Sequence, residues 1–291
     1  MWEKECENRF TQLKNNEETI NRLINETYGV SGSVSSSVSA DRVSVRKADR
    51  TRDIKNLISY AVGCMFGRYS LDAEGIVCAG VNAFDAANYS TFRADADNII
   101  PICDDNYFDD DIVGLFVEFI KVVYGEKTLE ENLRFIAETI GGKGQPRDII
   151  RNYFVKSFYE DHCSNYAVTG LGKRPIYWQF DSGKKNGFKC LVYIHRYQKD
   201  TIARIRTDYI HEQQSRYQTE IEDIETRIDK GTTSEKVKLN KTLKLLKEKA
   251  SELHLFEEKI HHLADQMIQL DINSGVVSNY QVLKDVLSKI K

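Results

Sequence analysis

Proline is scarce in this chain of 291 residues, which contains only three: Pro101, Pro146 and Pro175. Because proline removes a backbone donor and breaks helices, such scarcity favours a mainly helical protein. No two of the three prolines are adjacent, so any motif that needs a proline pair is excluded. The length suffices for one large domain or two ordinary ones with real cores.

Paired cysteines and long apolar runs are missing too. The six cysteines are scattered and form no C-x-x-C pair, which indicates free thiols in a reducing cytosol rather than a disulfide framework. The opening residues, MWEKECENRF, are too charged for a signal peptide. No apolar stretch approaches the length of a membrane span. We therefore expect a cytoplasmic protein with no membrane partner.

A large excess of charge of either sign is also absent, since the formal net charge is −3. With 41% hydrophobic and 29% charged residues, most of the chain is expected to fold. A nucleic-acid partner would have to be met by a local basic patch, because the protein as a whole is not basic.

The chain does have strong helical periodicity. Apolar residues at three–four spacing, bounded by glycine, proline or acidic caps, predict helices over 2–28, 52–69, 112–124, 128–140, 146–158, 199–230, 234–270 and 280–290. The two long helices broken at Gly231 predict an antiparallel helical hairpin with a coiled-coil-like seam. The fold class is therefore mainly α, a helical domain with a small antiparallel β-hairpin and a long antiparallel helical hairpin.

Composition along the chain predicts four parts. They are an N-terminal helix that connects to a missing upstream part (1–29), a serine-rich linker (30–51), a helical domain that ends in the β-hairpin (52–198), and the helical hairpin with a C-terminal helix (199–291).

Several local signals sharpen these boundaries. The aspartates of 109–111 lie in or before the first turn of a helix, where the macrodipole favours negative charge. Thr128 and Glu131 have the spacing of a capping box, and Pro146 suits the first position of its helix. A short strand is expected around 99–102.

The motifs for metal and nucleotide binding are incomplete in this sequence. The histidines and cysteines that come nearest to a metal set lack the two-plus-two spacing of structural zinc: His254, His261, His262, Cys190 and His195. The clusters GGKGQP (141–146) and TGLGKRP (169–175) do not fit the P-loop pattern GxxxxGK[ST]. The sequence therefore predicts no metal site and no cofactor-binding site in this chain.

Asp181 followed by Lys184 and Lys185 resembles part of a metal-dependent nuclease centre. That chemistry needs two acidic ligands and a lysine that converge, and no second acid stands at a suitable place on the following strand. The stretch DSGKKNG is instead typical of a turn, with Gly183, Asn186 and Gly187 where positive φ is needed. We therefore predict no catalytic residue here.

The segment RPIYWQFDSGKKNGFKCLVYIHRY (174–197) shows a period of two on both sides of this turn. The alternate apolar positions are Ile176, Trp178, Phe180, Phe188, Cys190, Val192 and Ile194. Such alternation predicts a β-hairpin with one apolar face.

Positive charge is concentrated in and after this hairpin. Residues 173–206 hold nine lysines and arginines and two aspartates, a formal charge of +7. This concentration is typical of a phosphate-contacting face, although a hairpin that covers an acidic surface such as 104–111 would show it too. The residues that we expect to contact phosphate are Arg174, Lys184, Lys185, Lys189, Arg196 and Lys199. Trp178 and Tyr193 are either core residues or residues that stack on bases.

Five stretches, in order along nearly the whole chain, resemble one family. They are residues 8–23, VRKADRTRDIKNLISYAVGCMFGRYSLD (45–72), DDNYFDDDIVGLFVEFIK (104–121), the hairpin segment 174–197, and DINSGVVSNY (271–280). They look like the C-terminal portion of the adenine-specific DNA methyltransferases of BREX phage-defence systems, the PglX family.

The resemblance implies double-stranded DNA as partner, together with the upstream methyltransferase portion and other BREX components. Members of this family carry an S-adenosylmethionine fold and an [ND]PP[YF] motif upstream, and no position of this chain matches either. The resemblance therefore implies a C-terminal accessory or target-recognition region that contributes DNA binding without the methyl-transfer centre. The alternative is a protein-interaction module that docks the methyltransferase core or another defence component without touching DNA.

Overall fold

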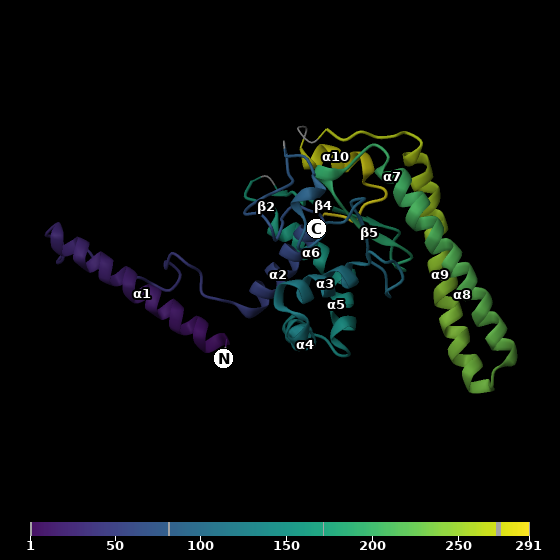
Figure 1. Ribbon diagram of the computed structural model, residues 1–291, viewed down its shortest axis with the longest axis horizontal. Coiled ribbons are helices and arrows are strands. Elements are labelled where there is room, and N and C mark those ends of the chain that lie inside the picture. The colour runs from purple at the N-terminus through teal and green to yellow at the C-terminus, as the bar shows by residue number, and fades with distance from the viewer. Residues whose placement is uncertain (1, 81, 171, 272–274, 291) are drawn as a thin grey trace. The chain divides into compact units, whose positions relative to one another are not determined.

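The computed structural model describes residues 2–80, 82–170, 172–271 and 275–290, so positions 272–274 of the segment DINSGVVSNY lie outside it. The predicted fold class is confirmed, because helices dominate and the strands form small antiparallel sheets (Figure 1). The chain divides into two compact units, Met1–Leu57 and Ile58–Lys291. In the described residues no helix has both the length and the hydropathy needed to cross a bilayer.

The first unit is built on the expected long helix α1 (Trp2–Thr27). The serine-rich segment that follows folds back along this helix. The Asn25 side chain donates to the Val34 carbonyl at 3.0 Å, and the Glu18 carboxylate accepts from the Val38 N–H at 3.0 Å. These side chains give the segment local partners, so part of it is ordered against α1.

In the described residues, five α-helices precede the hairpin in the second unit, which begins within α2. They are α2 (Arg50–Met65), α3 (Ile112–Tyr124), α4 (Leu129–Ile140), α5 (Pro146–Lys156) and α6 (Phe158–Asn165). The first four lie where apolar spacing predicts a helix, and Pro146 opens α5 as expected, whereas α6 was not predicted. The capping box at Thr128 is wrong: its hydroxyl donates back to the Tyr124 carbonyl at 2.8 Å, because Thr128 ends a short 3₁₀ turn.

The predicted β-hairpin consists of β4 (Tyr177–Asp181) and β5 (Lys189–Tyr193). The strand expected near residue 100 is β1 (Ile99–Pro101), which pairs with the other edge of β5 and makes β5 the central strand. A separate two-stranded ladder, β2 (Ala167–Val168) with β3 (Gly172–Lys173), was not predicted.

The C-terminal segment differs from its prediction for a reason found in this sheet. The last helix is α10 (Val276–Leu283), which ends well before residue 290. The chain then lies along β4, where the Asp181 N–H donates to the Val286 carbonyl at 3.0 Å and the Ser288 N–H to the Gln179 carbonyl at 2.8 Å. The open edge of β4 offers unpaired backbone groups, and pairing with them replaces further helix.

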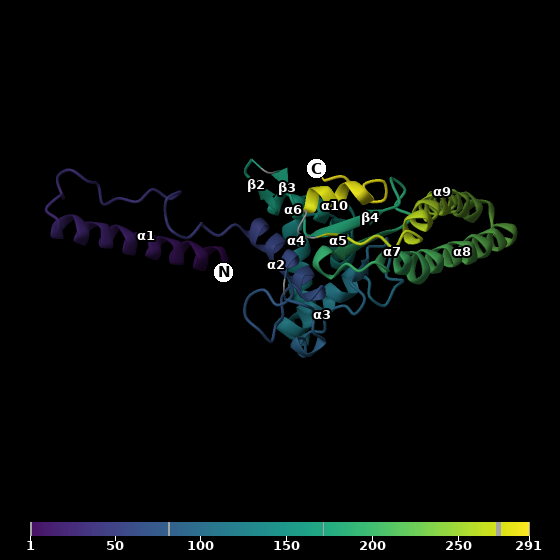
Figure 2. The ribbon, with the colours of Figure 1, turned by 90° about the horizontal axis from the view of Figure 1, so that it is seen from above.

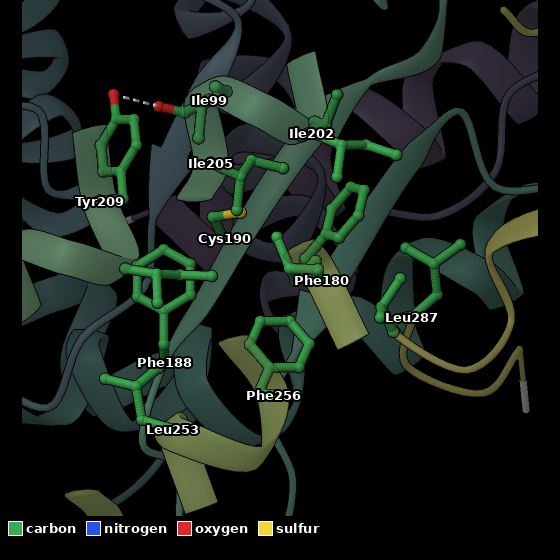
Figure 3. Packing of buried hydrophobic residues seen from close by; sticks show 14 of the residues in the cluster. Ile99, Phe180, Phe188, Cys190, Ile202, Ile205, Tyr209, Leu253, Phe256 and Leu287 are labelled. Atoms are coloured by element: carbon green, nitrogen blue, oxygen red, sulfur yellow. Dashed lines mark hydrogen bonds between the residues drawn. The ribbon is translucent and has the colours of Figure 1, made fainter. Parts of the chain in front are cut away.

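The prediction of a single apolar face on the hairpin is wrong, because both faces are buried. On one face Phe180 and Phe188 pack against Leu253 and Phe256 (Figure 3). On the other, Tyr177 stacks on a phenylalanine of the helical part at 5.1 Å between ring centroids. The hairpin is therefore an internal element that joins two layers.

The predicted helical hairpin is present as a two-helix arm. A continuous helical path runs through α7 (Thr201–Arg204), a π-helical stretch (Ile205–Ile210) and α8 (His211–Lys230), and it returns as α9 (Thr233–Ala264). The two long helices lie side by side and extend away from the sheet of the second unit (Figure 2).

Candidate nucleic-acid interface

The turn between β4 and β5 confirms part of the predicted turn chemistry. Gly183 and Asn186 have positive φ, at 138° and 58°. Gly187 does not, so the reason given for that glycine is wrong. A Cβ atom at Gly187 would lie 2.8 Å from the Lys249 carbonyl oxygen, so this glycine allows the turn to approach the backbone of α9.

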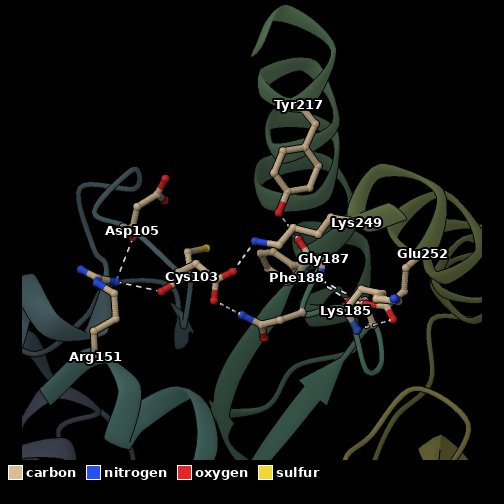
Figure 4. A network of polar contacts seen from close by, with 12 residues as sticks. Cys103, Asp105, Arg151, Lys185, Gly187, Phe188, Tyr217, Lys249 and Glu252 are labelled. Atoms are coloured by element: carbon tan, nitrogen blue, oxygen red, sulfur yellow. Dashed lines mark hydrogen bonds and ion pairs between the residues drawn. The ribbon is translucent and has the colours of Figure 1, made fainter. Parts of the chain in front are cut away.

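A single carboxylate of α9 holds this turn in place. Glu252 accepts hydrogen bonds from the Ser182 hydroxyl at 2.9 Å, the Lys185 N–H at 2.8 Å and the Gly187 N–H at 3.1 Å (Figure 4). Tyr217 of α8 donates to the Gly187 carbonyl at 2.9 Å. The arm and the hairpin are therefore joined through buried and half-buried polar contacts.

The acidic segment 104–111 also reaches the turn, as one interpretation of the sequence expected. Its contact is made by Asn186, which donates to Asp104, and not by a hairpin lysine. Lys249 of α9 pairs with the same aspartate. The excess positive charge of the hairpin is therefore not cancelled at this point.

Two of the six predicted phosphate contacts are used inside the protein. The Arg196 guanidinium donates to the carbonyls of Phe66 at 3.1 Å and Asp95 at 2.8 Å, and it lies 3.6 Å from the ring centroid of Phe84. Lys189 donates to a backbone carbonyl of α5 and has a side chain 13% exposed. Both side chains stabilise the fold.

The other four predicted contacts lie on the surface. Arg174, Lys184 and Lys199 are exposed and make no ion pair with a described carboxylate. Lys185 is exposed but pairs with Glu248 of α9 at 2.6 Å. Of the two aromatic candidates, Trp178 is 1% exposed and Tyr193 fully buried, so both are core residues and neither can stack on a base in this conformation.

A cleft of about 580 Å³ opens beside the hairpin and gathers lysines from distant parts of the chain. Lys184 and Lys189 of the hairpin lie on it together with Lys156 at the end of α5 and Lys289 near the C-terminus. Lys156, Lys184 and Lys289 are exposed. Neither Lys156 nor Lys289 was predicted, because they are more than a hundred residues apart and stand in no motif.

The floor of this cleft is a chain of hydrogen bonds. Gln179 donates to the Ser288 hydroxyl at 2.7 Å, and that hydroxyl donates to Asp181 at 2.6 Å. Gln179 is 5% exposed, and its amide oxygen has no partner among the described residues. A rim of lysines over a polar floor can bind phosphate groups, while Glu160 and Asp181 limit the excess of positive charge.

The arrangement around Asp181 does not pair this acid with Lys185, although Lys189 approaches its carboxylate to 3.9 Å. Its carboxylate accepts from Ser288 and from the Gly183 N–H at 3.0 Å. Lys185 is directed across the turn to Glu248. The acid and that lysine thus serve different contacts.

Three carboxylates that the sequence gave no reason to group come together elsewhere. Ligand atoms of Asp95, Asp97 and Asp110 lie within 4.8 Å of one another. The single hydroxyl proton of Tyr209 is shared between Asp97 at 2.9 Å and Asp110 at 2.5 Å, and Arg204 pairs with Asp97 at 3.3 Å. A neighbouring hydroxyl and a guanidinium therefore already contact Asp97 and Asp110.

The half-buried position of Asp95 makes the stability of the fold depend on pH. Burial, with the nearby charge of Asp97, raises the pKa of Asp95 from 3.8 to about 8. The folded state then keeps a proton that the unfolded state has released, so stability falls as pH rises toward and through about 8.

Replacing Asp95 by asparagine should remove this dependence. Between about pH 6 and about pH 9 the wild type should lose roughly 1–3 kcal/mol, a fall of several degrees in melting temperature, and Asp95→Asn should lose clearly less. Thermal unfolding at the two pH values measures it. Asp109→Asn, an exposed neighbour, serves as control and should behave like the wild type. Equal pH dependence in Asp95→Asn and wild type would contradict the assignment.

Fold and surface together define a mainly helical module with a buried sheet and a lysine-rimmed cleft. A scan against profiles of known protein families finds no match for the chain. Whole-chain comparison does find relatives. The chain is 40% identical over 284 residues to the adenine-specific methyltransferase PglX of Lacticaseibacillus casei (strain Zhang). It is 37% identical over 310 residues to the adenine-specific methyltransferase BrxX of Escherichia coli O9:H4 (strain HS).

These alignments cover 96% and 97% of this chain but 23% and 25% of the two relatives. The chain therefore spans about a quarter of the length of the curated relatives it matches, at their C-terminal ends. The chain is a relative of the C-terminal region of the adenine-specific methyltransferases PglX and BrxX, which confirms the resemblance described above.

Proposed function

We propose that this chain is a C-terminal accessory region that binds double-stranded DNA for an adenine-specific methyltransferase of a BREX phage-defence system. The lysine-rimmed cleft carries the proposal. Lys156, Lys184 and Lys289 converge on it from three segments, and each is exposed. The cleft holds four lysines against the two acids Glu160 and Asp181, and such an excess of positive charge is suited to contact the phosphate backbone.

This role is one of DNA grip or target recognition, and it includes no methyl transfer by this chain. The name adenine-specific methyltransferase belongs to the full-length relatives, and this chain corresponds to about their last quarter. S-adenosylmethionine and the target adenine would accordingly be bound by the upstream portion, which is the second partner that we propose.

The salt dependence of DNA binding tests the proposal. The triple variant Lys156→Gln, Lys184→Gln and Lys289→Gln should bind a short duplex more weakly. The slope of log affinity against log salt should fall by about one unit per lost phosphate contact, because each contact releases condensed counterions. Fluorescence anisotropy at several salt concentrations gives both quantities.

The matched control removes lysines that lie away from the cleft. Lys127→Gln with Lys143→Gln changes two exposed lysines near the ends of α4, and it should leave the slope unchanged. The cleft is not the DNA-binding site if the cleft variant keeps the wild-type slope. The same conclusion follows if the fall in slope for each lysine replaced is equal in the cleft variant and the control variant.

A second candidate function, docking of a protein partner, rests on a different surface. On α1 the apolar side chains Ile20, Leu23 and Ile24 are 55%, 52% and 49% exposed. An amphipathic helix with an open apolar stripe is a common docking element. Capture of the purified upstream methyltransferase portion, lost on Leu23→Glu, together with no duplex binding at low salt, would select this function over DNA binding.

A further inference from the structure

The first half of α9 carries a dense row of lysines that the hairpin charge count does not include. Residues 236–247 contain five lysines and no acidic residue. Lys238, Lys241 and Lys244 are exposed and have no ion-pair partner among the described carboxylates, whereas Lys247 pairs with Glu225. Most of the positive charge here is therefore left open to solvent.

The opposing helix of the arm has the opposite charge. Residues 220–230 of α8 hold five acidic residues and two basic ones. Because α8 and α9 lie side by side and run antiparallel, these segments are neighbours at the far end of the arm (Figure 1). Charge of each sign is thus sorted onto one helix, so an anionic partner would be attracted to α9 and repelled by α8.

A groove links this lysine row to the hairpin. The hollow along α9 has a volume of about 770 Å³, and Lys185 of the turn lines it together with Lys244 and Lys247. Asn240 and Ser251 add polar contacts, while Glu248 is engaged by Lys185. The Glu252 contacts described above fix the turn to α9, so the lysine row meets the turn at this groove, and the two together make a track in which Glu248 and Glu252 are the acids.

We propose that the outer face of α9, with Lys241 and Lys244 at its centre and Lys238 and Lys247 at its two sides, is a second surface for the phosphate backbone of a DNA duplex. This inference rests on the proposed DNA-binding function, and it adds the path that the duplex takes beyond the hairpin. The row covers roughly 14 Å of helix axis, which is about the length of four base-pair steps. DNA would leave the hairpin at Lys185 and follow α9, with the acidic α8 directed away from it.

The experiment compares the two sides of the same arm. The triple variant Lys238→Gln, Lys241→Gln and Lys244→Gln should reduce the salt slope of duplex binding by about one unit per contacted lysine. The control variant Glu222→Gln with Asp229→Asn removes exposed acids of α8 and should not reduce the slope. Circular dichroism of each variant checks that the arm remains helical, and the single variants Lys241→Gln and Lys244→Gln replace the triple variant if it does not.

The outcomes separate this inference from the function on which it rests. If the wild type does not bind duplex at low salt, the proposed function fails and this track fails with it. If duplex binding depends on Lys156, Lys184 and Lys289 but the α9 variant keeps the wild-type slope, the track alone is refuted. If polyglutamate competes with the duplex as strongly as DNA of equal charge does, and if this competition is lost in the α9 variant, the surface serves an acidic protein. The DNA assignment is then overturned.

Discussion

Replacing Asp111 by alanine should destabilise the second unit by about 3–5 kcal/mol, the cost typical of leaving a buried charge without its partner. The Asp111 side chain is fully buried and receives two hydrogen bonds from Arg151, at 2.7 and 2.9 Å. The same carboxylate caps α3 by accepting from the Val113 N–H at 2.9 Å. Alanine removes the cap and leaves the guanidinium, 13% exposed, with carbonyl acceptors only.

Chemical denaturation of Asp111→Ala and of the wild type measures this loss. Asp109→Ala is the matched control, since Asp109 precedes the same helix but is exposed, and it should change stability by less than about 0.5 kcal/mol. A second variant, Arg151→Met, should cost a similar amount as Asp111→Ala, and the double variant Asp111→Ala with Arg151→Met should cost less than the sum of the two. A loss in Asp111→Ala no larger than in Asp109→Ala would contradict the role given to this pair.

The acidic helix start at 109–111 was predicted from interactions between residues that are close in sequence. Features of this kind can be predicted from the sequence alone. A cap, a proline at the first turn and an apolar stripe depend on residues within a few positions of each other. The limits of α3, the start of α5 and the end of α8 follow from such rules. The pairing of Asp111 with Arg151 does not, because 40 residues separate the two and no pattern links them.

The hairpin is a case in which rules based on neighbouring residues predict the strands but not their burial. Alternation predicted two strands and a turn, and both are present. The alternation also predicted that only one face of the hairpin is apolar. In the structure Tyr177, Leu191 and Tyr193 lie on the other face and are buried. Aromatic side chains suit either a half-exposed or a central strand, so the burial of this face depends on helices that are distant in sequence.

The charge count was the poorest guide to the basic surface, because a count of charged residues does not say where each side chain is directed. The +7 of residues 173–206 includes Arg196 and Lys189, which the fold uses for carbonyl groups of its own backbone. It leaves out Lys156 and Lys289, which the fold brings to the cleft from other elements. Only the three-dimensional neighbours decide which lysines remain for a partner.

Replacing Glu252 by alanine should detach the hairpin turn from α9 and cost about 2–4 kcal/mol, because three donors lose a charged acceptor at once. The donors are the Ser182 hydroxyl and the N–H groups of Lys185 and Gly187. Water can replace the acceptor for some of them, which is why the loss is smaller than the sum of three full hydrogen bonds. Chemical denaturation measures the loss, and amide hydrogen exchange shows its location.

The exchange readout distinguishes a local role from general instability. The amides of Lys185 and Gly187 should exchange much faster in Glu252→Ala than in the wild type, while those of α3 and α5 keep their order of protection. Glu258→Ala, on the same helix but exposed and paired with His254 at 3.8 Å, should leave stability and exchange nearly unchanged. If the two turn amides remain protected without Glu252, the turn is held by the close packing of Gly187 on the Lys249 backbone instead. In that case Gly187→Ala, whose Cβ would lie 2.8 Å from that carbonyl oxygen, should be the more damaging variant.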